Sequence, residues 1–439
     1  MRWHRTKTAA KGHEQHGRHR LGSIAGPSPS SAAASRVEGR SAWLRLVIAV
    51  LISTIGGIGM WSVVVVLPAV QAEFGSTRAD ASLAYTATMV GFGLGGILMG
   101  RLTDRTGIAT TIAVGAVLLG LGYVSAGLSS SLWQFVAAQG VLIGMLGSSA
   151  TLGPLIADVS HWFDRRRGIA VSICASGNYL AGAVWPPIVE HFVDVAGWRP
   201  TYIGIGLSCT VTMLALSLAL RQKVLAGADG TTAASVQQER PLGLAPGTLQ
   251  LLLVVAGIAC CVAMSMPQVH IVAYCGDLGY GVARGAEMLS LMMGFGIVSR
   301  VASGWIADRM GGLATLLVGS VLQGVALLLY LGFDGLTSLY VISALFGLFQ
   351  GGIVPSYAII VREYFSPGEA GARIGFVLMA TLLGMALGGW MSGAIFDLAG
   401  SYWTAFANGL LWNALNGSIV LALLLRLGRR RTPTMMNAA

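Results

Sequence analysis

Long apolar stretches that recur along most of the chain limit its fold more than any other feature. Each of them approaches or exceeds the roughly 20 residues that cross a bilayer as a helix. Only 10% of the residues are charged, against about 25% in a typical soluble domain, so a soluble fold would lack polar surface. The sequence predicts an all-α membrane protein, embedded in the lipid bilayer, with twelve transmembrane helices at about 43–70, 82–100, 108–127, 132–158, 168–188, 200–219, 248–275, 285–303, 313–332, 337–361, 373–396 and 402–426.

The basic residues divide unevenly between the two faces that these spans define. Arg78, Arg199 and Arg284 fall on one face and Arg300 falls within a span, whereas the termini and all other lysines and arginines fall on the opposite face. Because loops rich in Lys and Arg stay in the cytoplasm, both termini are predicted to be cytoplasmic. An odd number of spans would scramble this division.

The formal net charge of +10 raises a second interpretation, nucleic-acid binding. The sequence has no zinc-finger spacing, no recognition-helix pattern and no interleaving of aromatic and basic residues. Membrane topology explains the charge instead, and no nucleic-acid partner is expected.

Motifs of other functional classes are missing from the sequence. A membrane-embedded enzyme would need a constellation such as G-x-S-x-G or H-E-x-x-H, an ATP-driven pump a P-loop, and a sensor usually a soluble output domain. The five cysteines lie in or beside apolar stretches without a C-x-x-C pair, which favours buried packing residues over metal ligands or disulfides. We therefore expect no enzymatic activity, no cofactor and no metal site.

A repeated motif divides the chain into two related halves. The pattern G-x-x-x-D-R-x-G occurs at 100–107 and again at 304–311, an offset of 204 residues, and Gly197 and Gly400 repeat with an offset of 203. Parallel repeats of this kind are a transporter architecture with the solute site between the halves. The predicted organisation is a disordered basic cytoplasmic tail (1–41), a six-helix bundle (42–220), a cytoplasmic connector (221–246), a second six-helix bundle (247–426) and a cytoplasmic tail (427–439).

The repeated loops resemble the major facilitator superfamily. The resemblance implies a pseudo-symmetric major facilitator fold, a monomer, and a cytoplasmic motif that latches the halves during alternating access. A solvated topology anchor is the other interpretation of this motif. The residues that carry the resemblance are Gly100, Asp104, Arg105 and Gly107, echoed by Gly304, Asp308, Arg309 and Gly311.

Within that superfamily, His161-Trp-Phe-Asp-Arg-Arg-Arg-Gly-Ile-Ala170 resembles a signature of the monocarboxylate porter and oxalate–formate antiporter group, in particular its bacterial members. This resemblance implies secondary active transport of a small carboxylate coupled to protons, in the bacterial inner (plasma) membrane. Two features depart from the group: no Lys or Arg follows Arg373 in the eleventh helix, and position 296 is Gly rather than Asp. The alternative is an exporter of drugs or other metabolites, which would favour an acidic residue facing the cavity from the first or fourth helix.

Arg300 is the sharpest candidate for substrate binding. It lies at about mid-depth in its span, where an arginine is costly unless it is paired or faces water. A guanidinium matches a carboxylate with two parallel hydrogen bonds, which favours anion binding. Snorkelling to the cytoplasmic face or a structural ion pair are the other interpretations.

Titratable and polar residues near the same depth complete the predicted site. His270 and Asp277 are the candidates for proton coupling, although a packing histidine and an ordinary loop acid are open alternatives. Asn178, Tyr357 and Tyr274 are the uncharged candidates for substrate binding, and hydrogen bonding between helices is the alternative for each.

Overall fold

The computed structural model describes residues 39–163, 166–221 and 242–436. Over these ranges the chain is helical without β-strands, and it forms twelve helices or helix groups that are long and apolar enough to cross a membrane. The predicted fold class and number of spans are confirmed, and each predicted span lies inside an observed one. Most of the predicted N-terminal tail and of the connector lies outside the described residues.

The N-terminal half contains two irregular spans. The first span is divided at Gly57, and the fourth changes helix type along its length, with a π-helical stretch whose glycines let neighbouring helices approach closely; a Cβ atom at Gly147 would come within 2.8 Å of Leu119. In order, the elements are α2 (Arg40–Gly56), α3 (Ile58–Phe74), α4 (Arg78–Thr106), α5 (Ile108–Gly127), α6 (Leu132–Ala137), η1 (Ala138–Gly147), η2 (Ser148–Thr151), α7 (Gly153–Ser160), α8 (Arg167–Ala196) and α9 (Trp198–Ala219).

The C-terminal half has the same order of spans. Pro246 and Pro367 lie in the first turns of α10 and α15, where their fixed φ suits the start of a helix and no intrahelical N–H is needed. The elements are α10 (Pro246–Asp277), α11 (Val282–Met310), α12 (Gly312–Gly332), α13 (Leu336–Gln350), α14 (Ile353–Tyr364), α15 (Pro367–Ala399) and α16 (Tyr402–Met436).

Glycines with positive φ end corresponding helices in the two halves. Gly107 (φ 87°) and Gly311 (φ 80°) follow α4 and α11, and Gly197 (φ 85°) and Gly400 (φ 65°) follow α8 and α15. Only glycine adopts this backbone conformation at little cost, so each turn can reverse the chain within a residue or two. The repeat seen in the sequence is thus a repeat in structure.

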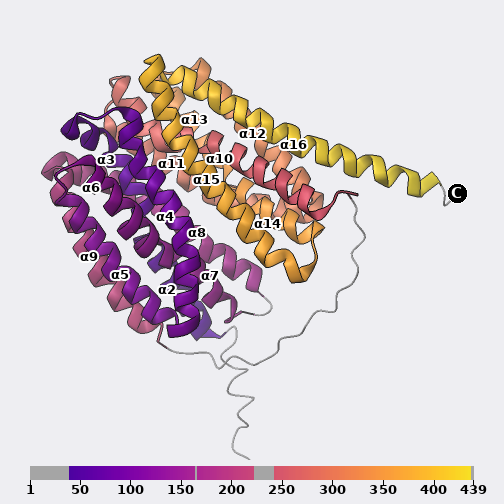
Figure 1. The fold of residues 1–439 in the computed structure, drawn as a ribbon, viewed down its shortest axis with the longest axis horizontal. Helices are drawn as coiled ribbons and strands as arrows, with labels where there is room; N and C mark the ends of the chain where they lie inside the picture. Colours follow the sequence, from indigo (N-terminus) through magenta and orange to yellow (C-terminus); the bar gives the residue numbers. More distant parts are fainter. Residues whose placement is uncertain (1–38, 164–165, 222–241, 437–439) are drawn as a thin grey trace, which may run out of the picture.

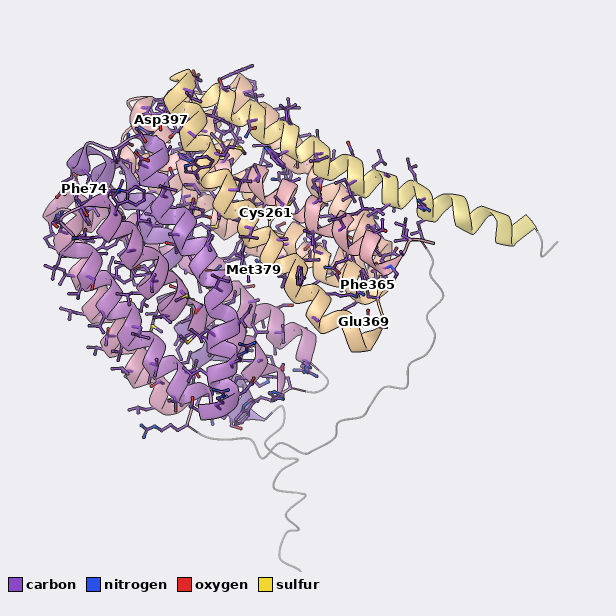
Figure 2. All side chains as sticks on the ribbon, in the orientation of Figure 1. Phe74, Cys261, Phe365, Glu369, Met379 and Asp397 are labelled. Carbon is purple, nitrogen blue, oxygen red and sulfur yellow. The ribbon has the colours of Figure 1, made fainter. Side chains whose placement is uncertain are left out.

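The two halves meet at one end of the bundle and separate toward the other. We call the end that carries the two G-x-x-x-D-R-x-G loops the motif side and the opposite end the distal side. The ribbons converge near α3 and α13 and diverge toward the start of α2 and the turn between α14 and α15 (Figure 1). Asp397 lies at the junction, whereas Glu369 lies at the far end of the C-terminal half (Figure 2).

Close contacts between the halves follow the same trend. A Cβ atom at Gly393 in α15 would lie 2.9 Å from the carbonyl oxygen of Arg78 in α4, and one at Gly182 in α8 would overlap Met293 in α11. On the motif side, by contrast, a Cβ atom at Gly100 or Gly375 would meet no other described atom within 4 Å. The halves are therefore closely packed from the distal side to the middle of the bundle, and their ribbons diverge toward the motif side (Figure 1).

Candidate functional site

Arg300 lies in α11 at the contact between the halves, about 15 Å along the helix from its motif-side end. Its Nη1 donates to the carbonyl oxygen of Ala175 in α8 at 3.3 Å, and its Cζ lies 4.0 Å from the ring centre of Tyr179, also in α8. Its Nε is buried without a hydrogen-bond partner among the described residues, which also offer it no carboxylate. The guanidinium is thus held by one carbonyl and one aromatic face.

The uncharged candidates lie at different places. Asn178 is next to Tyr179 in α8; its backbone carbonyl accepts from Trp61 Nε1 at 3.2 Å, and its side-chain Oδ1 is buried without a described partner. Tyr357 is fully buried inside the C-terminal half and donates to Asn416 at 2.9 Å. Tyr274 packs edge-on against Tyr402. Of the three, only Asn178 is adjacent in the chain to a residue that contacts Arg300, and its Oδ1 points toward Gly57, where a Cβ atom would lie 3.2 Å away.

Asp277 is the last residue of α10 and lies on the distal side, away from Arg300 in the fold. Its two carboxylate oxygens accept from Nη1 and Nη2 of Arg78 at 2.9 and 3.2 Å. Arg78 begins α4 in the other half, so this ion pair joins the two halves. The side chain of Arg78 is 10% exposed and that of Asp277 is 38% exposed, so the carboxylate remains in contact with solvent.

His270 is connected to this ion pair through the hydroxyl of Tyr402. Nη1 of Arg78 donates to Tyr402 Oη at 2.7 Å, Tyr402 Oη lies 3.0 Å from Nδ1 of His270, and Nε2 of His270 lies 2.8 Å from the carbonyl oxygen of Gly389. A carbonyl only accepts, so Nε2 carries a hydrogen, and Tyr402 is free to donate its own to Nδ1. A neutral imidazole satisfies every member of this chain.

A second carboxylate of the C-terminal half also contacts the start of α4. Asp397 accepts from the backbone N–H groups of Arg78 at 3.0 Å and of Ala79 at 2.7 Å. These are among the first N–H groups of a helix, which have no partner inside the helix and carry a partial positive charge. The N-terminal half's second transmembrane helix is therefore capped from the other half.

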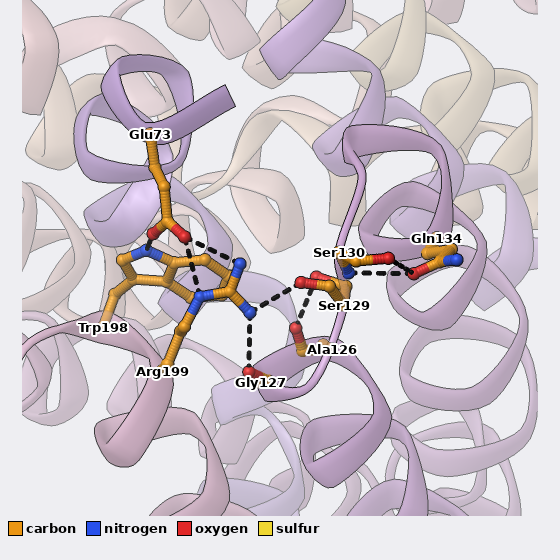
Figure 3. Close-up of polar contacts among 8 residues, drawn as sticks. All are labelled: Glu73, Ala126, Gly127, Ser129, Ser130, Gln134, Trp198 and Arg199. Atoms are coloured by element: carbon orange, nitrogen blue, oxygen red, sulfur yellow. Dashed lines mark hydrogen bonds and ion pairs between the residues drawn. The ribbon is translucent and has the colours of Figure 1, made fainter. Parts of the chain in front are cut away.

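The distal side of the N-terminal half has a polar network of its own (Figure 3). Arg199 at the start of α9 binds Glu73 at 2.7 Å and donates to the carbonyl oxygens of Gly127 and Ser129 at 2.9 and 2.6 Å, while Trp198 donates to the same glutamate. All five residues belong to one half. We call this network the N-terminal rim, and the group Arg78, Asp277, Tyr402, His270 and Asp397 the C-terminal rim.

The two rims occupy equivalent positions of the repeat. Glu73 and Asp277 are 204 residues apart, as are Trp198 and Tyr402, the first residues of α9 and α16. The glycines before these helices differ by 203 because Ser401 is one additional residue before α16. The position equivalent to Arg199 is Trp403, which is 59% exposed. The C-terminal half therefore has no cation at that place, and Arg78 of the other half supplies one.

The motif residues lie on the motif side at the ends of α4 and α11. Asp104, Arg105 and Asp308 are exposed, and within the described ranges they form no ion pair. Arg309 stacks on Trp305 of its own helix at 3.4 Å. Among the described residues, no ion pair or hydrogen bond of the motifs connects the halves in this conformation.

Sequence reasoning missed Tyr179, Tyr402, Asp397 and the pairing of Arg78. One signal pointed to the last of these, because Arg78 is one of three arginines on an otherwise cation-poor face. Extending the repeat offset from the motifs to Glu73 and Asp277 would have found the equivalent acids. Nothing in the sequence indicates that Tyr179 faces Arg300, since they lie in different halves.

Comparisons with known proteins agree with this architecture. The family model described as Major Facilitator Superfamily matches residues 49–333 and 308–435. A solved structure of a variant of the nucleoside transporter NupG superposes with a TM-score of 0.69 at 13% identity, covering 86% of this chain and 99% of that chain, which shows a shared fold.

Three relatives are similar over most of their length. Monocarboxylate transporter 13 of Bos taurus is 28% identical over 70% of this chain and 71% of its own. The MFS-type transporter pynF of Aspergillus niger is 24% identical, with 76% of each chain covered, and the agnestins efflux protein AgnL12 of Paecilomyces divaricatus is 24% identical, with 73% of each covered. With the family model matching most of the chain and twelve membrane spans in place, this protein belongs to the Major Facilitator Superfamily and is a multi-pass membrane transporter.

Proposed function

We propose that this transporter carries small monocarboxylates by alternating access and that Arg300 holds the substrate carboxylate. The observation that supports this best is the state of the guanidinium, whose Nε is buried without a partner among the described residues. A buried donor atom without a partner is costly, and a bound anion would satisfy it. The name of the bovine relative, a monocarboxylate transporter, favours the same substrate class.

Arg45 illustrates which edge of a guanidinium receives a carboxylate in this protein. Its Nε and Nη2 donate to the two oxygens of Asp158 at 2.7 and 2.8 Å, a side-on, two-bond contact. In Arg300 Nη1 is turned toward Ala175, so the edge formed by Nε and Nη2 is the one left for a ligand. A single carboxylate fits this edge.

Asn178 belongs to the same proposed site. It precedes Tyr179 in α8, and its buried Oδ1 lacks a described partner, so a donor on the substrate would satisfy it. Tyr274 and Tyr357 are occupied by packing and by hydrogen bonding in this conformation, and their part in substrate binding remains a prediction.

For energy coupling we propose proton symport through Asp277, with His270 as the alternative carrier. Protonation of Asp277 removes the negative charge that faces Arg78 and so weakens the bond between the halves on the distal side. The carboxylate is 38% exposed, whereas His270 is fully buried with both ring nitrogens engaged, which favours Asp277. The motif residues are proposed to latch the halves when the motif side closes, since Asp104 and Arg105 are exposed in the open arrangement.

Purified protein in liposomes tests the anion site. We expect uptake of at least one of lactate, pyruvate, formate and acetate, and a fall in affinity of roughly ten- to a few-hundredfold in Arg300→Ala, because a charge-assisted contact contributes about 1.5–3 kcal/mol. Arg300→Lys keeps the charge but loses the fork, and should recover only part. Arg284→Ala is the matched control, since Arg284 lies in the same helix and pairs with Glu287 on the distal side.

The same assay separates this proposal from its alternative. Normal monocarboxylate binding by folded Arg300→Ala would contradict the anion assignment and favour an exporter, in line with the name of the Paecilomyces relative. For coupling, Asp277→Asn should retain exchange of the anion but lose accumulation driven by a pH gradient. Retained accumulation in this variant would exclude Asp277 as the proton carrier.

A further inference from the structure

The groups that orient Arg300 belong to the opposite half of the transporter. Arg300 is carried by α11 of the C-terminal half, while the carbonyl of Ala175 and the ring of Tyr179 are carried by α8 of the N-terminal half. The carbonyl that precedes Tyr179 in the chain accepts a hydrogen bond from Trp61 in α3, which fixes this part of α8 to its own half. The orientation of the anion anchor thus depends on how the halves are placed.

The ring of Tyr179 fits against α11 because the residue that it faces there, Gly296, has no side chain. The Tyr179 side chain is 6% exposed, and a Cβ atom at Gly296, one turn before Arg300, would overlap its ring. The ring covers one flat face of the guanidinium at 4.0 Å, a cation–π arrangement that uses no N–H group of the guanidinium. A carboxylate binds in the plane of those edges.

We propose that Tyr179 is a positioning residue that holds the guanidinium of Arg300 in its carboxylate-binding orientation, so that movement of α8 against α11 changes the affinity for the anion. This rests on the proposed role of Arg300. While α8 and α11 are packed as they are here, Nη1 is held by the Ala175 carbonyl and Nε has no partner among the described residues, so the edge formed by Nε and Nη2 keeps its donors for the anion. When the helices move apart, Arg300 loses both its platform and the carbonyl that holds Nη1, and the anion is bound more weakly.

Substitutions at Tyr179 test the platform by binding and exchange of radiolabelled L-lactate and pyruvate. Tyr179→Leu removes the aromatic face and should raise KM and Kd by on the order of tenfold while the exchange kcat changes little, since cation–π contacts are worth several- to about thirtyfold in affinity. Tyr179→Phe keeps the face and should stay within about threefold of the unmodified protein. In an Arg300→Lys background, Tyr179→Leu should cost much less, because the flat guanidinium is gone.

A matched control removes packing between the halves without touching the anchor. Tyr85 is a buried tyrosine of α4 whose ring faces Gly389 of the other half, and Tyr85→Leu should leave KM unchanged. Equal rises in KM for Tyr85→Leu and Tyr179→Leu would overturn the positioning role. A Tyr179→Phe variant that binds the anion as weakly as Tyr179→Leu would do the same.

If Arg300→Ala loses binding while Tyr179→Leu keeps it, this inference fails and the proposed function stands. If the unmodified protein binds none of lactate, pyruvate, formate and acetate, or if Arg300→Ala binds normally, both fail.

Discussion

The two rims on the distal side have equivalent acids and aromatic residues but draw their cation from different places. In the N-terminal rim, Glu73 binds Arg199 of its own half, and the arginine also fastens the turn after α5. In the C-terminal rim, the position equivalent to Arg199 is a tryptophan, and Asp277 binds Arg78 of the other half. The N-terminal rim stabilises one half internally, whereas the C-terminal rim holds the two halves together.

Under the proposed alternating access, this difference separates contacts that persist during transport from contacts that must break. A half that moves as a rigid body keeps its internal ion pairs, so the N-terminal rim is expected to survive every step. An ion pair between halves has to open when the distal side opens. The free energy needed to break this ion pair contributes to the equilibrium between the state open on the motif side and the state open on the distal side. Arg78 is 10% exposed and Arg199 is 30% exposed, so Arg78 is the less hydrated of the two cations.

Crosslinking should give the largest contrast between the rims. Arg78→Cys with Asp277→Cys, bridged by a short bifunctional thiol reagent, should abolish transport because the distal side can no longer open. Glu73→Cys with Arg199→Cys, bridged in the same way, should transport as well after bridging as before it. The five native cysteines are buried, so they compete little for the reagent. Transport by the bridged 78–277 variant would mean that the halves do not separate there.

Removing the arginines one at a time should give an intermediate effect. Arg78→Ala leaves Asp277 and Asp397 together without a cation, and we expect the ratio of distal-closed to distal-open protein to fall by on the order of tenfold, about 1.4 kcal/mol. Arg199→Ala should lower the thermal stability of the protein without moving this ratio. Thiol labelling at a distal site or spectroscopic distances between the halves measures it. Equal changes of this ratio in both variants would contradict the distinction between the rims.

Asp397→Asn should have a smaller effect of the same kind. The carboxylate caps the first N–H groups of α4 from the other half, a contact worth about 0.5–1 kcal/mol, so the same ratio should fall roughly two- to fivefold. Asp80→Asn is the control, because Asp80 lies in the same first turn but does not bridge the halves in any described contact. A larger shift for Asp80→Asn than for Asp397→Asn would contradict the capping role.

His270→Gln should have the smallest effect. Glutamine can still accept from Tyr402 and donate to Gly389, so transport should change by about twofold or less and should keep its dependence on pH. The measurement is uptake over a range of external pH. If this variant lost the pH dependence while Asp277→Asn kept it, His270 rather than Asp277 would be assigned as the proton carrier.

Sequence reasoning predicted the spans, the repeat and the fold because each depends on local composition. Apolar length, glycine at chain reversals and the division of basic residues are all visible within short windows. The twelve spans and the family are confirmed. The orientation of the termini, the roles of the site residues and the choice of substrate remain predictions.

Side-chain partners could not be predicted in the same way, because they depend on which helices lie together. The sequence places Asp277 at a helix end but does not reveal that its partner lies 199 residues earlier in the chain. Nothing in the sequence distinguishes the two polar candidates Tyr357 and Asn178, yet Tyr357 is hydrogen-bonded deep in its own half and Asn178 precedes the tyrosine that contacts the other half. Depth and rotation about the helix axis decide this, and neither follows from composition.

The long separation of Arg78 from Asp277 has a consequence for how the protein is made. Every partner in the N-terminal rim has been synthesised once α9 has begun, so that half can complete its network while the ribosome is still translating the second half. Arg78 enters the membrane region without an acid, and its carboxylate arrives only with the end of α10. The ion pair therefore forms only when the two halves dock, and in a chain truncated before Asp277 the carboxylate partner of Arg78 is absent.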